Sequence, residues 1–225
     1  MKQIFGLLVA LLSLVSAPVS AGADQNAKMR EVIDVYSEIQ RLPERSVPPL
    51  LMKNAYGIAI IPSVVKVGFV VGGSYGEGVL SVRMADGTWS DPVFVSITGG
   101  SVGWQIGAQS SDVVLVFKSR RSVDGIMNGK FTLGADASVA AGPMGRKAAA
   151  ATDENLRAEI FSYSRSRGLF AGIALDGAAI QIKHQNNEQY YRQPYIAASE
   201  ILDGRVANPP ETSRRLRDLL GQYSR

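Results

Sequence analysis

The stretch from residue 56 to residue 117 constrains the fold more than any other part of the chain. It contains six short segments rich in β-branched residues, each bounded by Gly, Pro, Ser or Asp: 58–61, 64–71, 79–84, 93–98, 102–108 and 113–117. Such segments are typical of β-strands. Asp86-Gly87 lies between two of them and is a hairpin signal. Because no helical period separates the segments, we expect an antiparallel meander rather than a parallel α/β sheet.

Helical patterns flank this stretch. Residues 24–42 place apolar side chains at helical spacing between charged ones, and Pro43 ends the pattern. A final amphipathic helix is expected after Pro209-Pro210. Residues 168–183 predict a second hairpin around Asp176-Gly177. The fold class that these patterns predict is α+β and β-rich: a strongly bent antiparallel sheet or partial barrel with flanking N- and C-terminal helices.

These patterns divide the chain into four segments. We expect a signal peptide at 1–21, an N-terminal helical segment at 22–55, a β-rich body at 56–192 and a C-terminal helical segment at 193–225. Residues 22–225 are expected to form one globular unit, since a chain of this length can bury about 70% of its unfolded surface without cross-links.

The first residues have the features of a secretory signal. Lys2 provides a positive start, an apolar run follows, and Val19-Ser20-Ala21 supplies small residues where a signal peptidase cuts. The apolar run is shorter than the roughly 20 residues of a spanning helix, which favours cleavage over the alternative of an uncleaved anchor. The sequence therefore predicts export into a periplasm. Without Lys2 the net charge falls from +4 to +3, too little for a nucleic-acid-binding polycation.

Several kinds of chemistry have no support in the composition. The chain has no cysteine, which excludes disulfides and thiolate metal sites, and its only histidine is His184. No Walker loop and no Gly-x-Gly-x-x-Gly occurs, so a nucleotide site is not expected. We expect no cofactor and no metal.

One motif resembles the nucleophile elbow of a hydrolase. Residues 72–76 read GGSYG and fit Gly-x-Ser-x-Gly, and Asp176 and His184 follow in a permitted order. An elbow requires a helix directly after the serine, whereas residues 78–83 form a strand pattern. We therefore interpret Ser74 as a residue of a glycine-rich turn, and we expect no catalytic residues.

Basic residues give a stronger indication. Residues 118–167 contain nine Lys or Arg and five Asp or Glu, an excess larger than that of the whole mature chain. If these side chains converge, they form a cationic face suited to anionic lipid headgroups. The alternative is a mixed, solvated surface. The candidate headgroup contacts are Lys118, Arg120, Arg121, Arg146, Lys147, Arg165 and Arg167, with Leu169 and Phe170 as residues that insert among acyl chains.

Eight blocks in order connect the chain with a known family. They are YGIAIIP at 56–62, GFVVGG at 68–73, GEGVL at 76–80, WSDP at 89–92, GWQIG at 103–107, LG at 133–134, AGPMGR at 141–146 and YSRSRGLFAG at 163–172. Together they resemble the SYLF domain, a lipid-binding domain of bacterial exported proteins and of eukaryotic endocytic, actin-associated proteins. The resemblance covers most of the chain after the signal segment.

The resemblance implies phospholipid binding without catalysis. It implies phosphoinositides for eukaryotic members and actin for some fungal ones, neither of which we extend to an exported chain. The expected partners are anionic phospholipids or a membrane surface, with no nucleic acid and no nucleotide. The predicted function is non-catalytic binding of anionic phospholipid at the periplasmic membrane surface, in envelope maintenance. The alternative is an envelope protein-protein interaction or structural module that does not bind lipid.

Overall fold

The protein is described by a computed structural model. It describes the backbone of residues 21–41, 47–68, 71–102, 107–143, 158–166, 169–172 and 175–224. The predicted signal peptide lies outside this part of the chain, apart from its last residue, where the first helix begins.

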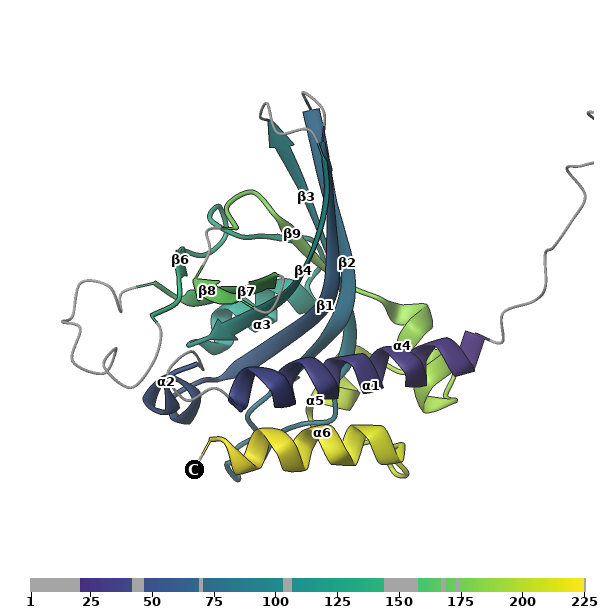
Figure 1. The fold of residues 1–225 in the computed structure, drawn as a ribbon. Coiled ribbons are helices and arrows are strands. Elements are labelled where there is room, and N and C mark those ends of the chain that lie inside the picture. Colours follow the sequence, from purple (N-terminus) through teal and green to yellow (C-terminus); the bar gives the residue numbers. More distant parts are fainter. Residues whose placement is uncertain are drawn as a thin grey trace, which may run out of the picture.

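Within the described ranges, helices stand at both ends of the chain and strands fill its middle (Figure 1). The helices are α1 (Ala21–Gln40), α2 (Pro49–Lys53), α3 (Arg120–Met127), α4 (His184–Tyr191), α5 (Ala198–Leu202) and α6 (Glu211–Gln222). The strands are β1 (Gly57–Gly68), β2 (Val71–Val82), β3 (Val93–Val102), β4 (Gly107–Phe117), β5 (Phe131–Thr132), β6 (Val139–Ala141), β7 (Ile160–Ser166), β8 (Leu169–Gly172) and β9 (Ala179–Ile182).

All of these strands belong to one curled sheet. Its order is β5-β9-β3-β2-β1-β4-β7-β6, and β8 pairs with β7. The α+β, β-rich fold predicted from the sequence is therefore confirmed. The order differs from a simple meander because β4 returns to the side of β1, so the four long strands form a Greek key. The sheet is also mixed, because β6 and β7 run parallel.

The expected hairpin at 168–183 is wrong. Strand β8 pairs with β7, whereas β9 pairs with β3 and β5. Asp176-Gly177 does form a turn, with Gly177 at a φ of 79°. The local turn signal was correct, but the neighbours of each strand are set by distant residues.

Strand β1 joins two segments that the sequence separates at Pro62. The strand continues through an irregularity between Ile61 and Val64, and Ser63 adopts a φ of 53°. Asp112 of β4 fixes this bulge, because its carboxylate accepts the backbone N–H of Ser63 at 2.9 Å. A bulge bends the sheet and removes the need to end the strand at a proline.

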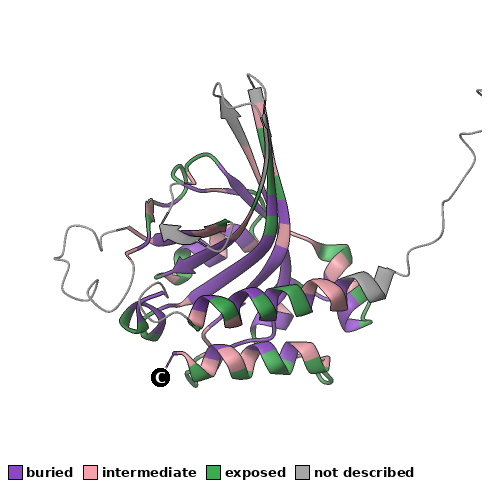
Figure 2. Ribbon diagram, viewed as in Figure 1, coloured by how far each residue is buried: buried purple, intermediate pink, exposed green. Residues whose placement is uncertain are grey.

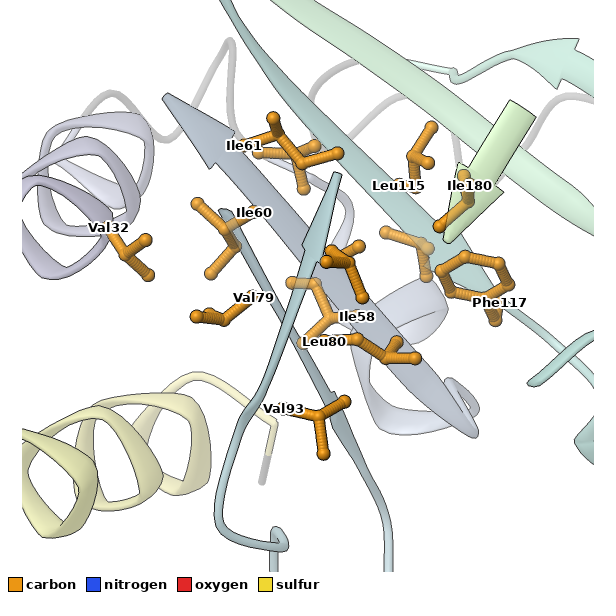
Figure 3. Packing of buried hydrophobic residues seen from close by; sticks show 14 of the residues in the cluster. Val32, Ile58, Ile60, Ile61, Val79, Leu80, Val93, Leu115, Phe117 and Ile180 are labelled. Atoms are coloured by element: carbon orange, nitrogen blue, oxygen red, sulfur yellow. The ribbon is translucent and has the colours of Figure 1, made fainter. Parts of the chain in front are cut away.

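The terminal helices cover one face of the sheet. Helix α1 packs on β1 and β2 and also contacts α4 and α6. Figure 3 shows Val32 of α1 facing Ile60 of β1 and Val79 of β2. On the other side of the sheet, Leu115, Phe117 and Ile180 lie together, and α3 packs nearby against β4 and β9. Burying apolar side chains on both faces of the strands stabilises the body.

The block WSDP at 89–92 anchors the C-terminal helix. Trp89 donates its Nε1–H to Ser224 Oγ at 3.0 Å. Asp91 is 1% exposed and accepts the hydroxyl of Ser213 at 2.6 Å, with Arg217 Nη1 at 3.3 Å. The block WSDP therefore has a packing role, because its Trp holds Ser224 just after α6 and its Asp holds two residues within α6.

Strands β1 to β4 extend beyond the helices as an arm (Figure 1). We define the arm as residues 64–68, 71–76, 98–102 and 107–111. Figure 2 shows that the described part of the arm is mainly exposed or intermediate, in contrast to the buried strands of the body. The same four strands are thus buried in the body, where helices pack on them, and mainly exposed or intermediate in the described part of the arm.

Candidate functional site

The structure places some of the predicted headgroup contacts and leaves others outside the described residues. Arg146, Lys147 and Arg167 lie outside them. Leu169 and Phe170 belong to β8 and pair with Ser166 and Arg165, and their side chains are not among those described. Lys118, Arg120 and Arg121 lie at the end of β4 and the start of α3, where all three are exposed.

Arg165 is engaged with carboxylates. Its Nη2 lies 2.6 Å and its Nε 2.8 Å from Asp112 Oδ2, and its Nη1 pairs with Glu38 of α1. The same Asp112 holds the bulge of β1. The Arg165 side chain is only 23% exposed. An incoming phosphate would have to displace two carboxylates, so the geometry makes Arg165 a tie between α1, β4 and β7.

A cavity of about 700 Å³ gathers cations from separate parts of the chain. It lies where β1 begins and β2 and β4 end, between α2, α3 and α5. Its lining has four cationic side chains and two carboxylates, besides apolar and small residues. The charged members are Lys53, Arg83, Lys118, Arg120, Asp124 and Asp203. We call this the basic cavity.

Arg83 forms the fixed charge in its wall. The guanidinium donates to the carbonyl oxygens of Met52 at 2.9 Å, Ala55 at 3.1 Å and Gly87 at 3.0 Å, and it stacks 4.6 Å from the Trp89 ring. Among the described residues, no carboxylate lies within ion-pair distance of it. Burial lowers the pKa of Arg83, but a guanidinium remains charged at neutral pH. Within the described part of the chain, the positive charge of this wall thus has no carboxylate as an ion-pair partner.

The other cations of the lining come from three different segments of the chain. Lys53 ends α2, and no described carboxylate pairs with it. Lys118 lies 5.8 Å from the Phe161 ring. Arg120 pairs with Asp124 at 3.3 Å across one turn of α3, an exposed pair that is worth little in water. Asp203 pairs with Arg205 at 3.0 Å. The balance of charge in the cavity therefore favours an anion.

Apolar side chains complete the lining. Val82, Val123 and Leu202 are buried, and Tyr56 and Met127 are partly buried against the core. Burial raises the pKa of Tyr56, so its phenol stays protonated. A cavity with cations beside an apolar wall suits an anionic group attached to an aliphatic part.

A second hollow of about 660 Å³ lies between Trp89 and the end of α6. It also includes Arg83, but its other cation, Arg217, is paired with the buried Asp91 at 3.3 Å. It therefore offers less uncompensated charge than the basic cavity.

The hydrolase motif has no catalytic geometry. Ser74 lies inside β2, which continues to Val82, and its Oγ donates to the Gly99 carbonyl at 3.4 Å. The helix that an elbow requires is a strand here. Among the described residues, no group of three or more acidic or histidine side chains is placed to hold a metal ion. Within the same ranges, no helix combines the length and apolarity that crossing a bilayer demands.

Sequence reasoning found half of the cations in this cavity. Lys118 and Arg120 were candidates because they belong to the basic stretch. Lys53 and Arg83 lie far from that stretch, and only the pairing of β1 with β2 and β4 brings them to it. Each looks like an ordinary surface cation in the sequence.

The fold is therefore a curled, helix-flanked sheet with a basic cavity at one end of its long strands. The family model described as "Ysc84: Las17-binding protein actin regulator" matches residues 98–223. The chain belongs to this family, and the resemblance to the SYLF domain is thereby confirmed.

Related proteins occur in fungi and animals. "Protein YSC84" of Saccharomyces cerevisiae is 38% identical over 179 residues, which cover 78% of this chain and 38% of the yeast protein. "SH3 domain-containing YSC84-like protein 1" of Xenopus laevis is 35% identical over 81% of this chain and 54% of the frog protein. An SH3 domain-containing protein of Schizosaccharomyces pombe is 40% identical over 72% of this chain and 38% of its own length. The chain thus spans between about two fifths and just over half of these relatives. Such names describe binding or regulator proteins rather than enzymes.

Proposed function

We propose that this protein binds anionic phospholipid without catalysis, with the headgroup phosphate in the basic cavity. The observation that carries the proposal is the convergence of Lys53, Arg83, Lys118 and Arg120 on one apolar-walled cavity. Arginine and lysine are the side chains that proteins use to hold phosphate. The apolar wall would accommodate the glycerol and the first acyl carbons.

The export signal predicted from the sequence completes the proposal. A cleaved signal at 1–21 would deliver the protein to the periplasm, where the membrane surfaces contain bulk anionic phospholipid. We propose a role there in envelope maintenance. The other predicted contacts, Arg121, Arg146, Lys147, Arg167, Leu169 and Phe170, remain proposals from the sequence alone.

Vesicle flotation tests the cavity. The wild type is mixed with vesicles of phosphatidylcholine alone and of phosphatidylcholine with phosphatidylglycerol. The double variant Lys53→Ala, Lys118→Ala removes two cations worth about 1 kcal/mol each near an anionic surface, so the preference for phosphatidylglycerol should fall about thirtyfold. Arg214→Ala, Arg215→Ala is the matched control, because both arginines are exposed on α6 outside the cavity.

The salt dependence of vesicle binding is a second test. The charge-dependent part of the binding should weaken as salt rises from about 0.1 M to about 0.5 M, because the screening length shortens. Equal loss of phosphatidylglycerol preference in the cavity variant and the control would contradict the cavity as the site. It would leave only a diffuse attraction of a basic protein.

A protein-binding function is the second candidate. The family description names Las17 binding and actin regulation, and one set of relatives is called "LAS seventeen-binding protein 3". For this chain the corresponding proposal is an envelope protein-protein interaction module. Recovery of one stoichiometric protein partner after cross-linking in the cell, with no preference for anionic vesicles, would favour it over lipid binding.

A further inference from the structure

The arm formed by β1 to β4 lacks charge to an unusual degree. Residues 67–76 and 92–111 contain no Asp, Glu, Lys or Arg. Lys66 is the one charged residue of the arm as defined above, and Glu77 and Asp112 stand at its base. Charged side chains normally make up about a quarter or more of a solvated surface. A protrusion with a single charged residue is therefore unusual for a surface that contacts only water.

The strand register gives the arm two different faces. Val65 of β1 pairs with Tyr75 of β2, which pairs with Thr98 of β3. Because paired residues share a face, Ser110 of β4, which pairs with Val65, also occupies a position on this face. Lys66 and Ser74 occupy positions on the opposite one. We call the first the apolar face of the arm.

This apolar face is the uncovered continuation of the face that α1 covers. Along β2, Val79 has the same parity as Tyr75, and Val79 faces Val32 of α1 in Figure 3. Beyond the helices nothing among the described residues replaces α1, and Val65 and Tyr75 are 44% and 48% exposed. An apolar face that a helix buries in one half is exposed in the other.

The area of the apolar face argues against a second copy as its cover. Four strands about 4.8 Å apart and about five residues long give a face of roughly 300 Å². Two such faces in contact would bury roughly 600 Å², about half of what a stable dimer needs. A bilayer interface imposes no such minimum and no shape complementarity.

We propose that the apolar face of the arm is a lipid-contacting surface that works independently of lipid charge. It lies in the interfacial region of a bilayer, with Val65 and Tyr75 toward the acyl chains. The edges limit its depth. Pairing of β3 with β9 ends at Thr98 and pairing of β4 with β7 ends at Asp112, so among the described residues no strand covers the outer backbone beyond these points. Unpaired backbone groups need water or headgroups, which the interface provides and the hydrocarbon core does not.

This proposal does not depend on the basic cavity. Strand β1 has 12 residues between its cavity end at Gly57 and its arm end at Gly68, a separation of roughly 36 Å at about 3.3 Å per residue. The two sites also differ in chemistry, because one needs anionic lipid and the other does not. An experiment can therefore refute the proposal for the arm and leave the proposal for the basic cavity standing, or the reverse.

The test uses uncharged vesicles and the chain without the predicted signal peptide at 1–21. Because the chain has no cysteine, Tyr75→Cys and Tyr195→Cys can each carry a single environment-sensitive fluorophore. Tyr195 is 92% exposed and lies outside the arm, so it serves as the matched control. With phosphatidylcholine vesicles in high salt, the fluorescence emission of the probe at position 75 should shift to the blue. A quencher attached to the lipid near the headgroup should reduce that emission. The probe at 195 should show neither effect.

Unlabelled variants separate the two faces. Val65→Asp with Tyr75→Ser should lower partitioning into phosphatidylcholine at least tenfold. Lys66→Asp places a carboxylate on the opposite face of the same strand and should change it less than twofold. Circular dichroism and the thermal midpoint check folding, and Tyr75→Ser alone serves as the milder variant.

Three results would overturn the proposal. The first is that the wild type shows no binding to phosphatidylcholine while its phosphatidylglycerol binding persists, which leaves the basic cavity intact. The second is that Lys66→Asp lowers partitioning into phosphatidylcholine as much as Val65→Asp with Tyr75→Ser does. The third is a dimer in sedimentation that Val65→Asp dissociates, which would identify a second copy as the cover.

Discussion

The buried carboxylate of Asp91 makes a sharp prediction about stability. It accepts the hydroxyl of Ser213, a fully buried residue, at 2.6 Å and lies 3.3 Å from Arg217 Nη1. Asp91→Ala removes a hydrogen bond to a charged group, worth about 1.5–3 kcal/mol, and leaves the Ser213 hydroxyl without this partner. The Arg217 side chain is 33% exposed, so solvent screening limits the ion pair to less than about 1 kcal/mol.

The expected loss is therefore about 3 kcal/mol of unfolding free energy. In a domain of this size that corresponds to a fall of roughly 6–12 °C in Tm. Urea unfolding followed by circular dichroism measures it. Asp91→Asn keeps the shape and one acceptor, and should cost about half as much. The control is Asp218→Ala, which removes an exposed carboxylate from α6. It should stay within about 0.5 kcal/mol of the wild type.

A double-mutant cycle with Arg217→Met isolates the ion pair. We expect a coupling of about 1 kcal/mol or less, with most of the Asp91 effect surviving in the Arg217→Met background. If Asp91→Ala costs less than about 1 kcal/mol at an unchanged m-value, the buried network does not anchor α6, and the reasoning is wrong.

Three further predictions concern the sheet and its two ends. A Cβ at Gly78 would lie 2.1 Å from the Ile60 carbonyl oxygen, so Gly78→Ala should lose more than about 3 kcal/mol in urea unfolding, whereas Gly221→Ala, in open space on α6, should be neutral or stabilising. Burial opposes ionisation of Glu77, but hydrogen bonds from Tyr75 and Lys183 outweigh it and lower the pKa of Glu77 below 4.5. Its stabilisation is thus present above the pKa of an unfolded glutamate and is lost as the pH falls through the lower folded-state pKa. Glu77→Gln should flatten the acid limb of the stability profile, and an unchanged limb would contradict the assignment. If both proposed lipid sites act together, the wild type should cluster anionic vesicles in light scattering, and variants at either end should not.

The strands of this fold could be predicted, but their neighbours could not. Alternating β-branched segments identify β1 to β4, because the signal lies within each segment. The placement of β4 beside β1 depends on pairs such as Ile58 with Val116, which no local pattern encodes. The same limit explains the wrong hairpin at 168–183, where a correct turn joins strands with different partners.

The charged residues show a similar limit. The sequence predicts Arg165 as a headgroup contact, since it stands in a basic stretch close to apolar residues. Its partner Asp112 is 53 positions away, and its other partner, Glu38, lies on a helix that the sequence leaves unplaced. Conversely, Arg83 looks unremarkable until three backbone carbonyls and the Trp89 ring fix its guanidinium. A residue type indicates what chemistry is available, and the tertiary contacts decide whether it is free to act.

The bulge at Pro62 and Ser63 marks where the long strands change their surroundings. Below it, α1 covers the apolar face and the strand ends enclose the basic cavity. Beyond it, the helical cover ends, and Lys66 is the one charged residue of the arm. Asp112 holds the bulge and also binds Arg165, which in turn pairs with Glu38 near the end of α1. One carboxylate thus connects the bend of the sheet with its helical cover, at the point where the apolar face passes from the covered body into the exposed arm.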